Sequence, residues 1–326
     1  MCHLTMASRC KVLLPALAIV SLAAVPAQAA MIITPTFTQA FINNFGANAG
    51  AAQNAWNAAA ATIASNFSDN IHINITVDAQ PGNAIFGFSD FIFGSVPYNT
   101  LHTAVVNDAL TADDAVATGV GGSIPAVSPV GGATWLVARP QAKALGLLAD
   151  DLNQDGITTF GAGNNFSFSG TPTGGAFDFQ GIALHEITEV MGRFGASGAG
   201  NQFTLIDEFS YLDVATRQLL GGPASFSIDN GTTLLKSFNN SALNGFDTRD
   251  WAPSAQGGDG SPDAFNQFSS PNVINGLSAV DLRVMDVIGY DRVAAAPTVP
   301  EPSTYILLVS ALVPFAALLR RRTDRD

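Results

Sequence analysis

The clearest pattern of apolar and polar positions lies in the middle of the chain, at residues 181–194. Apolar side chains recur there every three or four residues, which is the spacing of one face of an α-helix. They are Ala183, Ile187, Val190, Met191 and Phe194. The polar side chains, which fall together on the opposite face, are His185, Glu186, Glu189 and Arg193. The segment therefore predicts an amphipathic helix, which Gly195 ends as a C-terminal cap.

The rest of the chain predicts a mixture of strands and helices. Strict alternation of apolar and polar residues predicts a half-buried strand at 71–77. Other expected strands are 134–137, a strand and hairpin over 157–168, and a second hairpin over 225–238 that turns at Asn230-Gly231. The expected helices are 47–66, 98–110, 141–148 and 278–288, the last capped by Ser278. Residues 112–130 and 239–271 predict irregular loops.

The first 29 residues predict a secretory signal peptide. Arg9 and Lys11 precede an apolar run over 12–25, and Ala27-Gln28-Ala29 matches a cleavage site. The run is short for the alternative, an uncleaved membrane anchor. We therefore expect export, with removal of residues 1–29 by signal peptidase.

Residues 294–326 predict a linker followed by a second processing signal. Pro300-Glu301-Pro302 precedes an apolar run over 305–319 and the basic end Arg320-Arg321-Arg322. This order resembles the PEP-CTERM sorting signal of bacterial envelope proteins. The resemblance implies transient membrane tethering, cleavage by an exosortase, and delivery to the envelope or extracellular matrix of a Gram-negative-type bacterium. A plain C-terminal anchor is the alternative, although the run is shorter than the roughly 20 residues that a span needs.

Composition limits the chemistry of residues 30–293, the expected mature domain. Both cysteines, Cys2 and Cys10, lie in the signal peptide, so disulfides and thiolate metal ligands are excluded after cleavage. Between residues 30 and 299 the chain has 8 basic side chains against 23 carboxylates. So acidic a surface repels nucleic acid, which we exclude as a partner.

Histidine and glutamate are scarce, which makes their clustering informative. The histidines of the expected mature chain are His72, His102 and His185. The glutamates of the whole chain are Glu186, Glu189, Glu208 and Glu301. Three of the four glutamates therefore lie within one short stretch that also contains a histidine.

The spacing of His185 and Glu189 predicts a metal site. Residues four apart lie one turn apart on the same face of a helix, so both side chains can reach one ion. This is the HExxH arrangement of zinc peptidases, with Glu189 in place of the second histidine. A carboxylate can bind Zn²⁺ and also suits Mn²⁺ or Fe²⁺. Glu186 is the predicted general base. A metal-free surface helix with a Glu189–Arg193 ion pair is the alternative.

The sequence identifies the third metal ligand less directly than it identifies His185 and Glu189. The metzincin pattern would place it at Gly195, which has no side chain to bind a metal. Gluzincins take a glutamate from a later helix, and Glu208 lies at a suitable separation, with Asp207 adjacent. We favour this pair over His102 or His72. Met285 has two interpretations, a residue beneath the site as in metzincins or a core methionine.

A second candidate metal site lies at residues 151–156. Asp151, Asn153 and Asp155, followed by Gly156, match the first half of a calcium-binding loop. The twelfth position is Ala162 and not an acidic residue, so the full EF-hand pattern fails. Calcium binding and an Asx turn that joins a helix to a strand both remain open.

The motif and the two ends together resemble exported zinc metallopeptidases that carry PEP-CTERM signals. The residues that carry this resemblance are 185–193, 205–209 and 281–290. It implies an α+β, zincin-like fold of the metzincin or gluzincin type, with a twisted mixed sheet, an active-site helix and a helical C-terminal part. It also implies hydrolysis of a protein or peptide substrate. The alternative is a non-catalytic matrix or adhesion protein on a degenerate zincin scaffold. A serine hydrolase is disfavoured because the sequence has no G-x-S-x-G.

Overall fold

The computed structural model describes residues 31–293. The predicted signal peptide and the predicted linker and sorting signal lie outside the described residues. The described chain is a mixed α+β protein, and its buried apolar side chains form one contiguous core from Met31 to Tyr290. No helix within residues 31–293 is long and apolar enough to cross a membrane.

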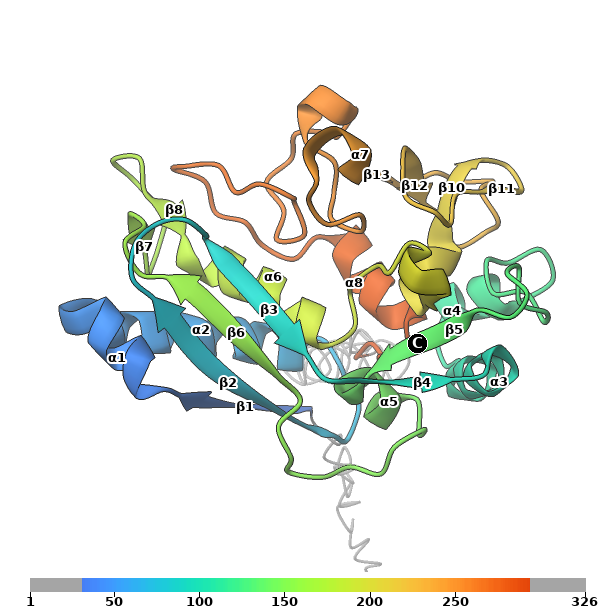
Figure 1. Cartoon of the computed structure of the whole chain (residues 1–326), viewed down its shortest axis with the longest axis horizontal. Helices are drawn as coiled ribbons and strands as arrows, with labels where there is room; N and C mark the ends of the chain where they lie inside the picture. The colour runs from blue at the N-terminus through green and yellow to red at the C-terminus, as the bar shows by residue number, and fades with distance from the viewer. Residues whose placement is uncertain (1–30, 294–326) are drawn as a thin grey trace, which may run out of the picture.

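A mixed four-stranded sheet occupies one half of the molecule (Figure 1). Its strand order is β1-β2-β6-β3, and β3 lies at an edge. The strands are β1 (Ile32–Phe37), β2 (His72–Gln80), β6 (Gly156–Gly161) and β3 (Gly87–Phe91). The first three pair in parallel, and β3 pairs antiparallel with β6. The sheet is therefore mixed, as expected, although the sequence pattern predicted neither β1 nor β3.

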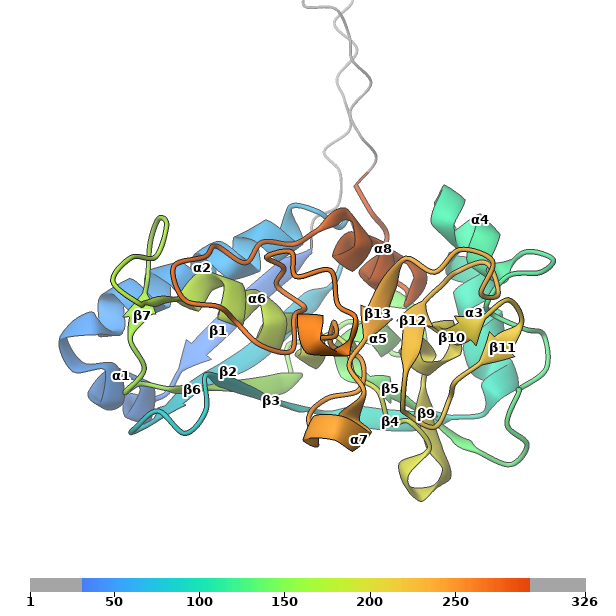
Figure 2. The same ribbon diagram turned by 90° about the horizontal axis from the view of Figure 1, so that it is seen from above.

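Three helices cover one face of this sheet. They are α1 (Gln39–Phe45), α2 (Ala49–Ala64) and α6 (Phe179–Val190). The alternation in β2 buries Ile73, Ile75 and Val77, which join the same core as these helices. Trp56 of α2 donates a hydrogen bond to Thr158 of β6 at 3.2 Å. Figure 2 shows α6 between α2 and the long loops that follow β13.

The other half contains two smaller sheets. A three-stranded sheet consists of β4 (Phe93–Val96), β5 (Thr134–Ala138) and β9 (Gln202–Thr204). A four-stranded sheet consists of β10 (Ser210–Asp213), β11 (Thr216–Arg217), β12 (Ala224–Phe226) and β13 (Lys236–Phe238). The helices of this half are α3 (Tyr98–Asp108), α4 (Ala112–Thr118), α5 (Arg139–Ala144), α7 (Ser241–Asn244) and α8 (Ala279–Val287).

Several local predictions are confirmed and others are not. Ser278 caps α8 through a capping box, and β12 pairs antiparallel with β13 as the predicted hairpin. Helix α4 lies in the predicted loop 112–130, because Thr111 and Asp114 form a capping box that starts it. The short strands β7 (Phe166–Ser167) and β8 (Phe177–Asp178) pair in parallel in a sheet that does not include β6, so the predicted hairpin over 157–168 does not form.

The C-terminal part differs from the helical region that the resemblance implied. Within residues 196–293, α7 and α8 are the α-helices, and a small antiparallel sheet and long loops make up most of the rest. The glycine, asparagine and aspartate content of this region explains the difference, because these residues favour turns over helix. One of these loops contributes to the site described below.

Candidate metal centre

Helix α6 brings His185, Glu186 and Glu189 together as the sequence predicts. It ends at Val190, earlier than expected, because Gly192 has a φ of 108° and the chain leaves the helical path there. Both of its faces are covered. The apolar face packs in the core, and on the polar face Glu186 and Glu189 are buried while His185 is partly exposed. The helix is therefore not the solvated surface helix of the metal-free alternative.

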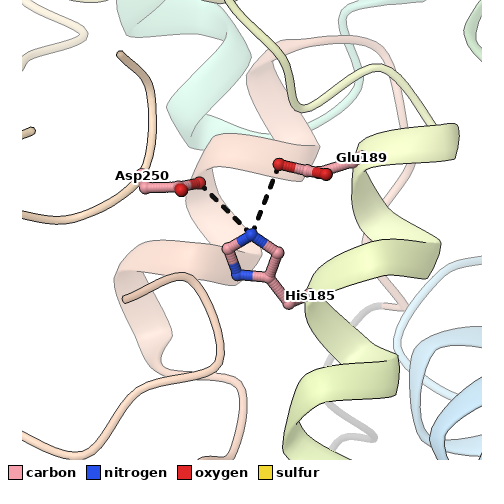
Figure 3. A group of neighbouring side chains, drawn as sticks. All are labelled: His185, Glu189 and Asp250. Atoms are coloured by element: carbon pink, nitrogen blue, oxygen red, sulfur yellow. Dashed lines mark ion pairs between the residues drawn. The ribbon is translucent and has the colours of Figure 1, made fainter. Parts of the chain in front are cut away.

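A third carboxylate, Asp250, completes a possible metal site with His185 and Glu189 (Figure 3). The Nε2 atom of His185 lies 3.3 Å from Glu189 Oε1 and 3.5 Å from Asp250 Oδ1. One ligand atom from each residue lies within 4.8 Å of the others. Ligands about 2.1 Å from a tetrahedral zinc ion are about 3.4 Å apart, so these spacings fit such an ion.

Hydrogen bonds to neighbouring groups orient two of the three side chains. The Nδ1 atom of His185 lies 2.9 Å from the backbone oxygen of Ala264. A carbonyl only accepts, so Nδ1 carries the proton and Nε2 is left to bind a metal. The hydroxyl of Ser89 on β3 donates to Glu189 Oε2 at 2.7 Å. With these hydrogen bonds made, Nε2 of His185 and Oε1 of Glu189 face the candidate site.

Arg193 contacts both carboxylates of the group. Its Nη1 atom lies 2.7 Å from Asp250 Oδ1, and its Nη2 atom lies 3.4 Å from Glu189 Oε1. The Glu189–Arg193 ion pair of the metal-free alternative is therefore present. This ion pair is buried, however, and His185 Nε2 also lies near the two carboxylate oxygens that Arg193 contacts.

Glu186 has a different environment from Glu189. Its Oε2 atom is buried and has no hydrogen-bond partner among the described residues. Burial raises the pKa of Glu186 well above its usual range, and the nearby Glu189 charge adds to this effect. Burial also acts to raise the pKa of Glu189, but the charges of His185 and Arg193 outweigh it and lower that pKa to about 2. Two carboxylates with opposite shifts are suited to different roles, an anionic ligand and a proton carrier.

An open cleft of about 760 Å³ gives access to these side chains. Helix α6 forms one side of it, β3 forms a second, and residues 246–250 and 266–269 form a third. The cleft contains several phenylalanines. Phe91 stacks on Phe194 with ring centroids 3.7 Å apart, and Phe246 meets Phe268 edge to face at 5.3 Å. The cleft is thus lined by the polar side chains of the candidate metal site and by aromatic side chains around them.

The structure does not bring Asp207 or Glu208 to His185 and Glu189. Asp207 accepts hydrogen bonds at the start of a 3-10 helix (Leu205–Phe209) and forms an ion pair with Arg249 at 2.7 Å. Glu208 is fully buried and forms an ion pair with Arg217. Burial raises the pKa of Glu208 to about 8 although Arg217 acts to lower it. Asp250, and neither of these two carboxylates, lies close enough to His185 and Glu189 to share a metal with them, so Asp250 replaces the expected pair as third-ligand candidate.

The other histidines and Met285 also lie outside the group. His72 pairs with Asp150 at 2.7 Å, and His102 lies on α3 beside the ring of Tyr98. Met285 is buried in the core, which agrees with its interpretation as a core residue.

The candidate calcium loop forms ion pairs within the protein. Asp151 pairs with Arg139 at 2.8 Å, and buried Asp155 pairs with Lys143 at 2.9 Å. The backbone N–H of Asn153 donates to Asp151 Oδ1, which is the Asx turn that the sequence left open. Within residues 31–293, the group of His185, Glu189 and Asp250 is the one set of three ligand side chains close enough for a metal.

Sequence reasoning did not single out Asp250, Gly87 or Ser89. Asp250 lies in a segment that predicts an irregular loop and contains several other aspartates. Its neighbours fix it in place: Arg249 binds Asp207, and Trp251 donates to Asp281 at 2.7 Å. The one local signal was an Arg-Asp-Trp triplet within a polar loop, and it does not indicate a ligand.

Comparison with known proteins identifies no relative. No protein-family model, curated protein or solved structure matches this chain.

Proposed function

We propose that this protein is an exported, metal-dependent endopeptidase with a zincin-like fold. One observation carries the proposal. His185, Glu189 and Asp250 converge at metal-ligand spacing in a cleft bordered by an edge strand, beside Glu186, whose buried Oε2 has no hydrogen-bond partner within residues 31–293. The donor set has one nitrogen and two oxygens, which suits Zn²⁺ and also Mn²⁺ or Fe²⁺.

A bound cation would polarise the scissile carbonyl and lower the pKa of a water molecule. The chain supplies the remaining chemistry. His185, Glu189 and Asp250 would hold the cation, with the imidazole oriented by the backbone of Ala264. Glu186 would accept a proton from the attacking water at a carboxylate oxygen and then donate it to the leaving amine. The buried position of Glu186 keeps competing solvent away from that proton.

Strand β3 supports an extended peptide as the substrate. Gly161 N donates to Phe86 O, and Ile92 N donates to Asp155 O, so residues 86 and 92 face β6. Alternation in an antiparallel ladder then directs the backbone groups of Gly87, Ser89 and Phe91 away from β6, toward the open edge. An extended peptide in the cleft can pair with these groups, as in strand addition to a sheet edge.

The two ends of the chain support the proposed location. A signal peptide and a PEP-CTERM-like segment would direct export, with signal peptidase and an exosortase as processing enzymes. Under this proposal, the peptidase acts at the cell envelope or in the extracellular matrix after transient tethering.

The test combines metal analysis with hydrolysis of casein by the purified mature domain. We expect about one transition-metal ion per chain and hydrolysis that a chelator abolishes. Glu186→Gln should retain the metal and lose at least about 100-fold in rate, because it lacks a proton acceptor. A metal-containing protein without hydrolysis would favour the non-catalytic matrix or adhesion protein. A protein that binds no transition metal would contradict the proposal.

A further inference from the structure

We propose that Arg193 sets the charge of the metal centre and thereby compensates for the carboxylate of Glu189. This inference rests on the proposed function, because it concerns the same metal site. Arg193 lies four residues after Glu189, just beyond the end of α6, and contacts Oε1 of Glu189 and Oδ1 of Asp250. These are the two oxygens that face Nε2 of His185. The guanidinium and a bound cation would therefore share both carboxylates.

The charges of the four side chains give the site the same net charge as a common type of catalytic zinc site. His185 would be neutral when it binds a metal, because a histidine ligand must lose its Nε2 proton, and its sum with two carboxylates and the Arg193 guanidinium is then −1. Two neutral histidines and one carboxylate, a common ligand set for catalytic zinc, have the same sum. Glu189 in place of a histidine adds one negative charge, and Arg193 offsets it. With a divalent cation the centre then has a charge of +1, as in the His₂–carboxylate sites.

The contacts around Arg193 fix the position of its guanidinium group. Arg193 is 1 % exposed, so water screens its charge little. Its Nε atom donates to Thr188 Oγ1 at 3.1 Å, and its guanidinium lies 4.3 Å from the ring centre of Phe265. An ordinary i, i+4 ion pair on a helix surface has none of these restraints and contributes little. The buried position indicates that Arg193 influences the metal site and is not simply part of a solvent-exposed ion pair.

The experiment is a set of four proteins titrated with Zn²⁺ after metal removal: wild type, Arg193→Met, Glu189→His and the double variant. Dissociation constants are measured by competition with a chelating dye. Loss of the arginine charge should tighten zinc binding by about tenfold or more, and Glu189→His should weaken it by a similar factor. The double variant restores the total of −1 and should bind within about threefold of wild type. Arg193→Lys keeps the charge and should also stay near wild type.

A purely structural role for Arg193 predicts the opposite change in the zinc affinity of Arg193→Met. Arg193→Met would then bind zinc more weakly because its ligands are misplaced, and the double variant would be weaker still; that result overturns the inference. If Arg193→Met does not fold, the double variant decides, since restored affinity supports charge compensation and a tenfold weaker one refutes it. A wild type that binds no zinc would instead overturn the proposed metal site, and the role of Arg193 with it.

Discussion

Gly87 lies against Glu186 so closely that a Cβ atom at residue 87 would overlap the Glu186 carboxylate. Glycine on the edge strand is therefore what leaves room for the proposed base. Gly87→Ala should displace Glu186 and lower the hydrolysis rate by about 100-fold, because small displacements of a reacting group are costly. It should also destabilise the fold by about 1–3 kcal/mol through overpacking. Peptide hydrolysis and urea unfolding measure the two effects.

Gly94 on β4 provides the control for this substitution. A Cβ atom there meets nothing within 4 Å, so Gly94→Ala should leave rate and stability nearly unchanged. Equal rates for Gly87→Ala and wild type would show that the position of Glu186 does not limit the reaction.

Asp250 should be needed for metal binding. Asp250→Asn removes a charged ligand candidate and leaves the buried guanidinium of Arg193 without its closest partner. We expect at least a tenfold loss of zinc affinity, and a metal-free protein less stable by about 3–5 kcal/mol because a buried charge is unpaired. Zinc titration and chemical unfolding test both expectations.

Glu208→Gln distinguishes the two candidates for the third ligand. Glu208 pairs with Arg217 away from the cleft, so its substitution should lower stability but leave zinc affinity within about twofold of wild type. Loss of zinc binding in Glu208→Gln, with Asp250→Asn unaffected, would return the ligand role to Glu208.

The protein should lose stability as the pH rises from about 4 to 8. Burial, with repulsion from Asp291, raises the pKa of Asp69 to about 7 and that of Asp108 to about 8. In the unfolded chain these groups titrate near pH 4, so between pH 4 and 8 the folded protein binds more protons. The stabilisation is complete below about pH 4 and disappears as the pH passes the folded pKa values.

Asp108→Asn tests this pH dependence. The substitution should raise the free energy of unfolding at pH 8, by on the order of 1 kcal/mol, and change it little at pH 5. The control is Asp213→Asn, which alters an exposed aspartate on β10 and should have little effect at either pH. An identical pH profile for Asp108→Asn and wild type would contradict the assignment.

Bulky apolar side chains should be favoured in the substrate. Phe246 and Phe268 are 51 % and 48 % exposed, and their rings meet at the cleft. The Phe268→Ser variant should cleave peptides with phenylalanine or leucine near the scissile bond with about tenfold lower kcat/KM, and alanine peptides with a smaller change. Leu243→Ser is a matched control, because Leu243 is exposed on nearby α7 but does not line the cleft. Equal losses on both peptides would exclude a specificity role.

Local patterns predicted the elements whose information lies within a few residues. The alternation at 71–77 appears as β2, and Ser278 caps α8. The pattern predicted neither β1 nor β3. Their positions depend on pairing with β2 and β6, which lie far away along the chain. Long-range pairing of this kind has no signature in a short window of sequence.

The sequence by itself determined that His185 and Glu189 share one helix face and that Glu186 lies beside them, because helical periodicity is a local property. Only the tertiary structure decided which carboxylate joins them. Asp207, Glu208 and Asp250 are chemically equivalent candidates, but Arg249 and Arg217 bind the first two, and Asp250 meets His185 together with Arg193. The choice depends on which carboxylate lies within reach of His185 and Glu189, and packing between distant segments fixes that position.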